Sequence, residues 1–196
     1  MTDDRFALET VAAIRLLICT GQRVLELLRI EAHEVDLVDR VWRMPAEKTK
    51  TKIAPHDVPL PDLAVPVLKQ LLAVRRRGFL FGNMEHQVIN RAISRWLADV
   101  DMPHFQTRDL RRTWKSRAAD AGVDRFTRDL IQQHAQGDTS SKHYDRADYL
   151  PQKRAAMTAW NDYLVRAISP TAAPGTRPAG HIPGTEAGPA LAAAGN

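Results

Sequence analysis

The sequence predicts a mainly α-helical domain with a small antiparallel β-sheet, an α+β fold. Apolar residues recur with helical spacing through most of the chain after Pro61, and Gly and Pro residues separate these stretches. Three short segments with strand-like character lie between residues 35 and 60. The chain has 196 residues, of which 44% are hydrophobic and 26% are charged. That length and composition suit one domain with a sizeable core.

The elements are expected in a definite order. A helix over about residues 6–18 ends at Thr20-Gly21, where the glycine can adopt a left-handed cap, and a second helix begins near Arg23. Short strands are expected at residues 35–38, 41–44 and 53–60, with Asp39-Arg40 as a hairpin turn. Later helices are expected at about residues 63–76, 87–100, 107–121, 125–133, 139–146 and 151–167.

The last part of the chain differs in composition from the rest. Residues 169–196 are rich in Ala, Pro and Gly and contain almost no large apolar residue. Such a segment buries too little apolar surface to offset its ordering entropy. We therefore expect a folded domain at residues 1–168 and a disordered tail at residues 169–196.

Charge and cysteine content narrow the function classes. The formal net charge is +5, and residues 107–117 hold five Arg or Lys residues against the single acid Asp109. This cluster suits a phosphate backbone, although a solvated helix face would have the same composition. Cys19 is the only cysteine, which excludes an internal disulfide and a cysteine-based zinc site. With no long apolar stretch and no signal-peptide core at Met1, we expect a cytoplasmic protein away from membranes.

Five segments along the chain carry a recognisable pattern. They are residues 20–28 (Thr-Gly-Gln-Arg-Val-Leu-Glu-Leu-Leu), residues 48–51 (Lys-Thr-Lys-Thr) with 58–60 (Val-Pro-Leu), residues 107–113 (Thr-Arg-Asp-Leu-Arg-Arg-Thr), residues 133–135 (Gln-His-Ala) and Tyr144. In this order and spacing they resemble the catalytic boxes of tyrosine recombinases of the phage-integrase family. The resemblance spans roughly residues 8–164.

The resemblance implies a site-specific DNA recombinase that needs no metal, cofactor or ATP. Tyr144 would attack the scissile phosphate, form a 3′-phosphotyrosyl link and release a 5′-hydroxyl. Arg23 and Arg111 would clamp the phosphate, because a guanidinium binds phosphate oxygens in pairs and stays charged. Lys50 would protonate the leaving oxygen, and His134 would donate to a phosphate oxygen. Double-stranded DNA is the expected partner, bound by a homotetramer that is monomeric when free.

The same pattern places Arg108 where the family usually has histidine. An arginine cannot accept a proton there, but it can donate to the phosphate from the helix face that it shares with Arg111. The group that takes the proton from Tyr144 therefore stays open.

Other residues compete for some of these roles. Lys48 and Lys52 lie one strand step from Lys50 on the same expected face, so each is an alternative acid. Tyr149 is a weaker candidate nucleophile because it adjoins Leu150-Pro151, and His143 has no assigned role.

Two expectations concern what surrounds the site. Only a short helix precedes Arg23, so we expect the family's N-terminal core-binding domain to be absent and DNA binding to be weak and salt-sensitive. The helix over residues 151–167 would pack on its own domain in a free monomer or on a neighbouring subunit in an assembly. A catalytically silent DNA-binding remnant and a type IB topoisomerase-like enzyme are the alternative functions.

Overall fold

The computed structural model describes residues 6–50, 52–134 and 149–169. Tyr144, His143, the helix expected at residues 139–146 and the tail from residue 170 lie outside this part of the chain. Within it, the predicted class is confirmed: helices dominate and one three-stranded sheet is present. None of the helices in this part is long and apolar enough to cross a membrane.

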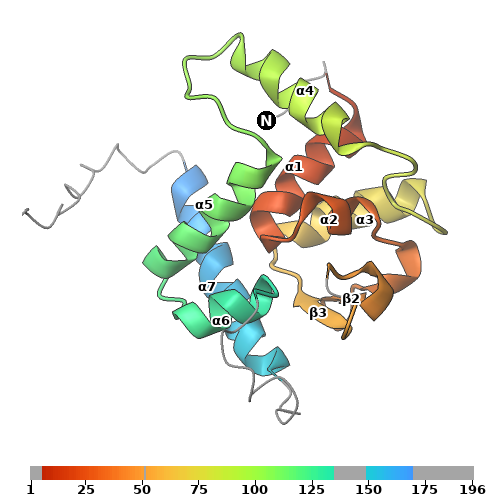
Figure 1. Ribbon diagram of the computed structural model, residues 1–196, viewed down its shortest axis with the longest axis vertical. Coiled ribbons are helices and arrows are strands. Elements are labelled where there is room, and N and C mark those ends of the chain that lie inside the picture. Colours follow the sequence, from red (N-terminus) through yellow and green to blue (C-terminus); the bar gives the residue numbers. More distant parts are fainter. Residues whose placement is uncertain (1–5, 51, 135–148, 170–196) are drawn as a thin grey trace, which may run out of the picture.

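The elements follow one another in the expected order. They are α1 (Leu8–Thr20), α2 (Val24–Leu28), the 3-10 helix η1 (Ala32–Glu34), β1 (Val35–Asp36), β2 (Val41–Met44), the 3-10 helix η2 (Ala46–Lys48), β3 (His56–Pro59), α3 (Ala64–Val74), α4 (His86–Leu97), α5 (Thr107–Asp120), α6 (Arg125–Ile131) and α7 (Leu150–Ile168). Figure 1 shows the sheet on one side of the molecule and α5 and α6 on the other.

The sheet is antiparallel in the order β1-β2-β3, and Trp42 of β2 pairs with Val35 on one side and Val58 on the other. The strand expected from Ile53 to Leu60 was wrong at its start. Ile53 is 84% exposed and belongs to a loop, and the strand begins only at His56. The later start of the strand follows from burial. The side chains of β3 contribute to the core, whereas those of the loop before it are exposed.

The end of α1 fixes the position of α5. Gly21 has a left-handed φ of 65°, and its N–H donates to the carbonyl of Leu17 at 2.9 Å, which confirms the predicted cap. A Cβ on Gly21 would lie 2.5 Å from the ring of Trp114 in α5. Glycine is therefore required twice here, by the backbone conformation and by the close packing of the ring.

Two groups of buried apolar residues meet at α1. The larger group joins α1, α2, the sheet, α3 and α4, and it includes the buried Cys19. The smaller group joins α5, α6 and α7 around Trp114 and Trp160. The indole N–H of Trp160 donates to the carbonyl of Ile18 at 3.0 Å, so α7 packs on its own domain, as expected for a free monomer.

Candidate active site

A pocket of about 530 Å³ lies between α2, the segment around η2 and the start of α5. Four of the six predicted site residues line it: Arg23, Lys50, Arg108 and Arg111. His134 adjoins the pocket through Arg111, since its Nε2 lies 3.3 Å from Nη2 of that arginine. The sixth predicted residue, Tyr144, lies outside the described residues.

Arg23 occupies the N-cap position of α2 and is held by Glu26. Its Nη1 donates to Oε1 of Glu26 at 3.0 Å, and its backbone N–H donates to Oε2 at 3.3 Å. Nη2 of Arg23 donates to the carbonyl of Gln133 at 3.4 Å. Glu26 is only 4% exposed, so the pair is a partly buried ion pair that lines the pocket rather than a solvated surface contact.

Glu26 also positions the lysine segment, because the backbone N–H of Lys50 donates to its Oε1 at 3.2 Å. The expectation that Lys48, Lys50 and Lys52 share one strand face was wrong. Lys48 ends η2, and Lys52 has a left-handed φ of 55°, so the described residues of this segment, 48–50 and 52, do not form a strand.

Lys48 is bound to acidic neighbours. Its Nζ donates to Glu31 at 2.7 Å, to Glu34 in a shorter contact, and to the carbonyl of Arg29 at 3.0 Å. Burial lowers the pKa of Lys48, but the hydrogen bonds to the two carboxylates outweigh burial, and its pKa is raised overall. Lys48 is therefore a weak proton donor.

Arg111 is held by backbone carbonyls. Its Nη1 donates to the carbonyl of Gly21 at 2.7 Å, and its Nη2 donates to the carbonyl of Gln132 at 2.5 Å. Burial, reinforced by the charge of Arg23, lowers the pKa of Arg111 to about 10, so it remains cationic at neutral pH. The two guanidinium groups therefore lie close enough to interact unfavourably, and an anion between them would relieve that repulsion.

His134 follows α6 through a sharp bend at Gln133, which has a φ of 47°. The backbone N–H of His134 donates to the carbonyl of Asp129 at 2.9 Å. Its ring Nδ1 lies 2.7 Å from Nζ of Lys115 and 3.3 Å from Oδ1 of Asp129. Burial, then the charges of Lys115 and Arg111, lower the pKa of His134 despite the opposing carboxylate, which favours the neutral ring.

Arg108 is exposed and lines the same pocket as Arg111, one helical turn earlier in α5. This arrangement agrees with the helix face predicted from their spacing.

Sequence reasoning predicted Glu26 as the partner of Arg23 but missed two other residues that support the site, Lys115 and Gln132. Lys115 lies one turn beyond Arg111, so helical spacing alone could have placed it on the same face. Gln132 is 1% exposed, and its Nε2 donates to the carbonyls of Gly21 and Arg111 at 3.2 Å and 3.0 Å. No pattern in the sequence marks Gln132, because both contacts join segments about 20 to 110 residues apart.

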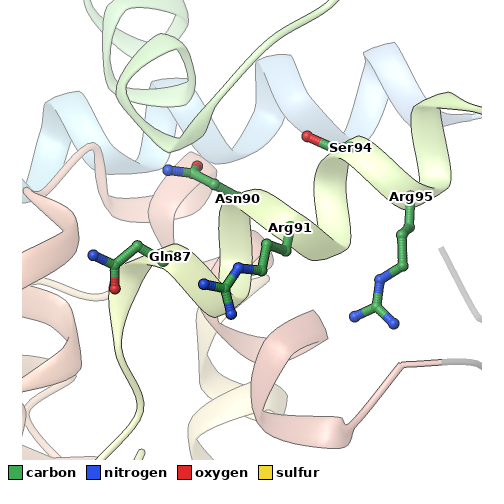
Figure 2. Close-up of a pocket in the computed structure, with 5 residues that line it drawn as sticks. All are labelled: Gln87, Asn90, Arg91, Ser94 and Arg95. Atoms are coloured by element: carbon green, nitrogen blue, oxygen red, sulfur yellow. The ribbon is translucent and has the colours of Figure 1, made fainter.

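A second, shallower concavity of about 730 Å³ runs along α4 (Figure 2). Its lining residues are Gln87, Asn90, Arg91, Ser94 and Arg95. In Figure 2 the guanidinium groups of Arg91 and Arg95 extend from the same side of the helix. Oδ1 of Asn90 accepts the backbone N–H of Thr107 at 3.1 Å, and Thr107 lines the arginine pocket, so the two surfaces adjoin. We call this polar face of α4 the α4 face.

Comparison with known proteins identifies the class. The model of the phage integrase family matches residues 2–150, so the chain belongs to the phage integrase family. The fold is that of integrase and tyrosine recombinase catalytic domains.

The individual relatives are longer than this chain. Prophage integrase IntA of Escherichia coli (strain K12) is 29% identical over 148 residues, which are 69% of this chain and 34% of that protein. The integrase from mycobacterium phage Brujita superposes with a TM-score of 0.63 at 24% identity, covering 80% of this chain and 53% of that one. The Tn1549 transposon integrase in complex with transposon right end DNA gives a TM-score of 0.55 at 19% identity, covering 74% of this chain and 57% of that one. The chain thus spans about a third of the curated relative and just over half of the solved structures.

Proposed function

We propose that this chain is the catalytic domain of a site-specific DNA recombinase that cuts and rejoins duplex DNA through a 3′-phosphotyrosyl link to Tyr144. The observation that carries the proposal is the pairing of Arg23 and Arg111 in one pocket, each fixed by hydrogen bonds. The transition state of phosphoryl transfer gathers negative charge on the non-bridging oxygens. Fixed cationic donors aimed at that charge are the largest expected source of catalysis.

Lys50 is the proposed acid that protonates the leaving 5′-oxygen. Its backbone is fixed to Glu26, and it lines the pocket, whereas Lys48 is bound by two carboxylates. A lysine held in that way keeps its proton, so Lys48 is the poorer candidate. Lys52 also lines the pocket and remains the alternative to Lys50.

His134 and Arg108 are the proposed additional donors to the phosphate. His134 adjoins Arg111, and Arg108 lines the pocket from the same helix as Arg111. The role of Tyr144 rests on its position ten residues after His134 and on the family resemblance. Since Arg108 replaces the family's histidine, we propose that the proton of Tyr144 leaves to water or to another group.

Duplex DNA is the proposed partner, supported by the α4 face and by the Tn1549 integrase, which was solved with DNA. Arg91 and Arg95 add positive charge along α4 (Figure 2). Phosphate contacts of this kind weaken steeply as salt rises. We propose weak, salt-sensitive binding for the 196-residue chain, with a tetramer forming on DNA.

A covalent-trapping experiment tests this function. Nicked suicide duplexes with randomised arms are incubated with the chain, and protein–DNA adducts are isolated after denaturation and sequenced. We expect an adduct that Tyr144→Phe abolishes and Tyr149→Phe retains. DNA binding without an adduct would favour the silent remnant. Relaxation of supercoils without exchange between two captured sites would favour the topoisomerase-like alternative.

A further inference from the structure

Lys115 and Asp129 form a charged pair behind His134. Nζ of Lys115 lies 2.7 Å from Oδ1 of Asp129 and 2.7 Å from Nδ1 of His134. The carboxylate of Asp129 is also approached by Nε of Arg125 at 3.8 Å. Lys115 belongs to α5 and Asp129 to α6, and His134 lies in the segment after α6. Nη1 of Arg128 donates to the carbonyl of Lys115 at 2.8 Å, which further ties α6 to α5.

We propose that Lys115 is a positioning residue: anchored by Asp129, it donates a hydrogen bond to Nδ1 of His134 and holds the ring in the tautomer that carries its proton on Nε2. This proposal rests on the proposed function, because it explains how His134 presents a donor to the scissile phosphate.

The contacts select this tautomer. A neutral imidazole has one nitrogen that donates and one that accepts, and an ammonium can only donate. Nδ1 of His134 must therefore accept from Lys115, which leaves the proton on Nε2. The opposite tautomer would use contacts of 3.3 Å to Asp129 and 3.3 Å to Arg111, both longer than the 2.7 Å contact to Lys115.

In this tautomer the contact between His134 and Arg111 is not a hydrogen bond, because both groups can only donate. Nε2–H of His134 and the Nη2 group of Arg111 are then two donors whose nitrogens lie 3.3 Å apart. Two neighbouring donors are satisfied together by one acceptor that carries negative charge, and a non-bridging phosphate oxygen has that character.

Burial and the neighbouring positive charges favour the neutral ring. Burial, Lys115 and Arg111 lower the pKa of His134, and Asp129 opposes them. Removing the charge of Lys115 would raise that pKa and free Nδ1–H to donate to Asp129 instead. The neutral ring would then lose its Nε2 donor, whereas the protonated ring, which carries both N–H groups, would recover it.

Nitrogen-15 NMR of the free protein with labelled histidine tests the tautomer directly. His134→Gln identifies the His134 signals among those of the seven histidines. Wild type should show neutral His134 with the proton on Nε2, and Lys115→Met should move it to Nδ1 and raise the pKa. A wild-type proton on Nδ1, or an unchanged tautomer in Lys115→Met, would overturn the proposal. Thermal unfolding of both proteins checks that the variant is folded.

Cleavage against pH supplies the functional readout. Lys115→Met should cleave at least about tenfold more slowly than wild type at pH 8, a smaller loss than the ~10²–10³ expected on removing an oxyanion donor outright. Its deficit should shrink as pH falls through the raised pKa of His134, and Lys115→Arg, which keeps a cationic donor, should restore part of the rate. A loss that is equal at every pH would contradict the positioning role. If wild type forms no adduct, the proposed function fails, while the NMR result still decides the tautomer.

Discussion

The two sides of the arginine pocket are built from different kinds of partner. On the Arg23 side, the buried carboxylate of Glu26 binds the guanidinium of Arg23 and the backbone of Lys50, and the carbonyl of Gln133 adds one longer contact at 3.4 Å. On the Arg111 side, backbone carbonyls at the ends of α1 and α6 bind the guanidinium. The Arg23 side can therefore be altered by changing one side chain, whereas the Arg111 side is part of the packing of the fold.

Because Arg111 is bound into the packing of the fold, Arg111→Ala should have the largest combined effect on cleavage and stability. Cleavage should fall about 10²–10³-fold, because the substitution removes a fixed donor that we propose binds the transition state. The free energy of unfolding should also fall by about 1–3 kcal/mol, since the carbonyl of Gln132 loses its donor in a buried setting. Single-turnover adduct formation and urea unfolding measure the two effects.

Arg112→Ala is the matched control for that substitution. Arg112 follows Arg111 in α5, but its side chain is 67% exposed and pairs with Asp109 on the surface. Its removal should leave stability within about 0.5 kcal/mol of wild type. Equal losses of stability in the two variants would mean that the hydrogen bonds from Arg111 to the backbone carbonyls do not stabilise the fold.

A second prediction tests how far the Arg111 side depends on packing. Gly21→Ala should lower the free energy of unfolding by roughly 2–4 kcal/mol, through backbone strain and contact with Trp114. Denaturant unfolding measures this loss. Gly78 has a similar φ of 69°, but no atom lies within 4 Å of a Cβ added there. Gly78→Ala should therefore lower the free energy of unfolding through backbone strain alone. Similar losses in both variants would show that the Trp114 contact is unimportant.

On the Arg23 side, Glu26→Gln should separate catalysis from stability. The amide keeps an acceptor for the N–H of Lys50 but loses the charge that orients Arg23. We expect about a tenfold loss of cleavage, with a stability change under about 1 kcal/mol and DNA binding that is not weakened. Glu47→Gln, at an exposed residue lining the same pocket, is the control. A stability loss as large as that of Arg111→Ala would remove the distinction between the two sides.

The last prediction concerns the pH dependence of stability and His56, which supports the Arg111 side from β3. Its Nε2 lies 3.0 Å from the carbonyl of Ile131, and burial, followed by the charge of Lys153, lowers its pKa to about 3. The folded state therefore binds fewer protons than the unfolded state between about pH 6.5 and pH 3. Stability should be retained above this window and lost as pH falls through it, by up to about 1.4 kcal/mol per pH unit.

Unfolding of wild type and His56→Gln at a series of pH values measures that slope. The variant should show a shallower dependence than wild type, and His33→Gln, at a side chain 72% exposed, should match wild type. Because His134 also has a lowered pKa, part of the slope remains in His56→Gln. Identical slopes in wild type and His56→Gln would contradict the assignment.

The sequence supported the local parts of this picture better than the long-range parts. The cap at Gly21 and the shared face of Arg108 and Arg111 depend on neighbouring residues, and both are found in the structure. The shared strand face expected for Lys48, Lys50 and Lys52 was wrong, because the spacing of exposed polar residues does not show whether a segment pairs with a neighbouring strand.

Contacts between distant segments could not be predicted from one sequence. Gln132 reaches Gly21 across 111 residues, and His56 reaches Ile131 across 75. Lys115 belongs to the basic cluster of residues 107–117, but its proposed role depends on where the end of α6 places Asp129 and His134. The sequence therefore predicted the residues proposed to contact phosphate more readily than the distant residues that position them.

Replacing the charged scissile phosphate tests the central claim most directly. The captured duplex is prepared with an ordinary phosphodiester or with a neutral methylphosphonate at the scissile position, and cleavage by wild type, Arg23→Ala and Arg111→Ala is compared. If the two arginines neutralise charge on the non-bridging oxygens, both variants should lose about 10²–10³-fold on the phosphodiester and far less on the methylphosphonate. Equal losses on both substrates would contradict that role and leave the arginines as structural residues.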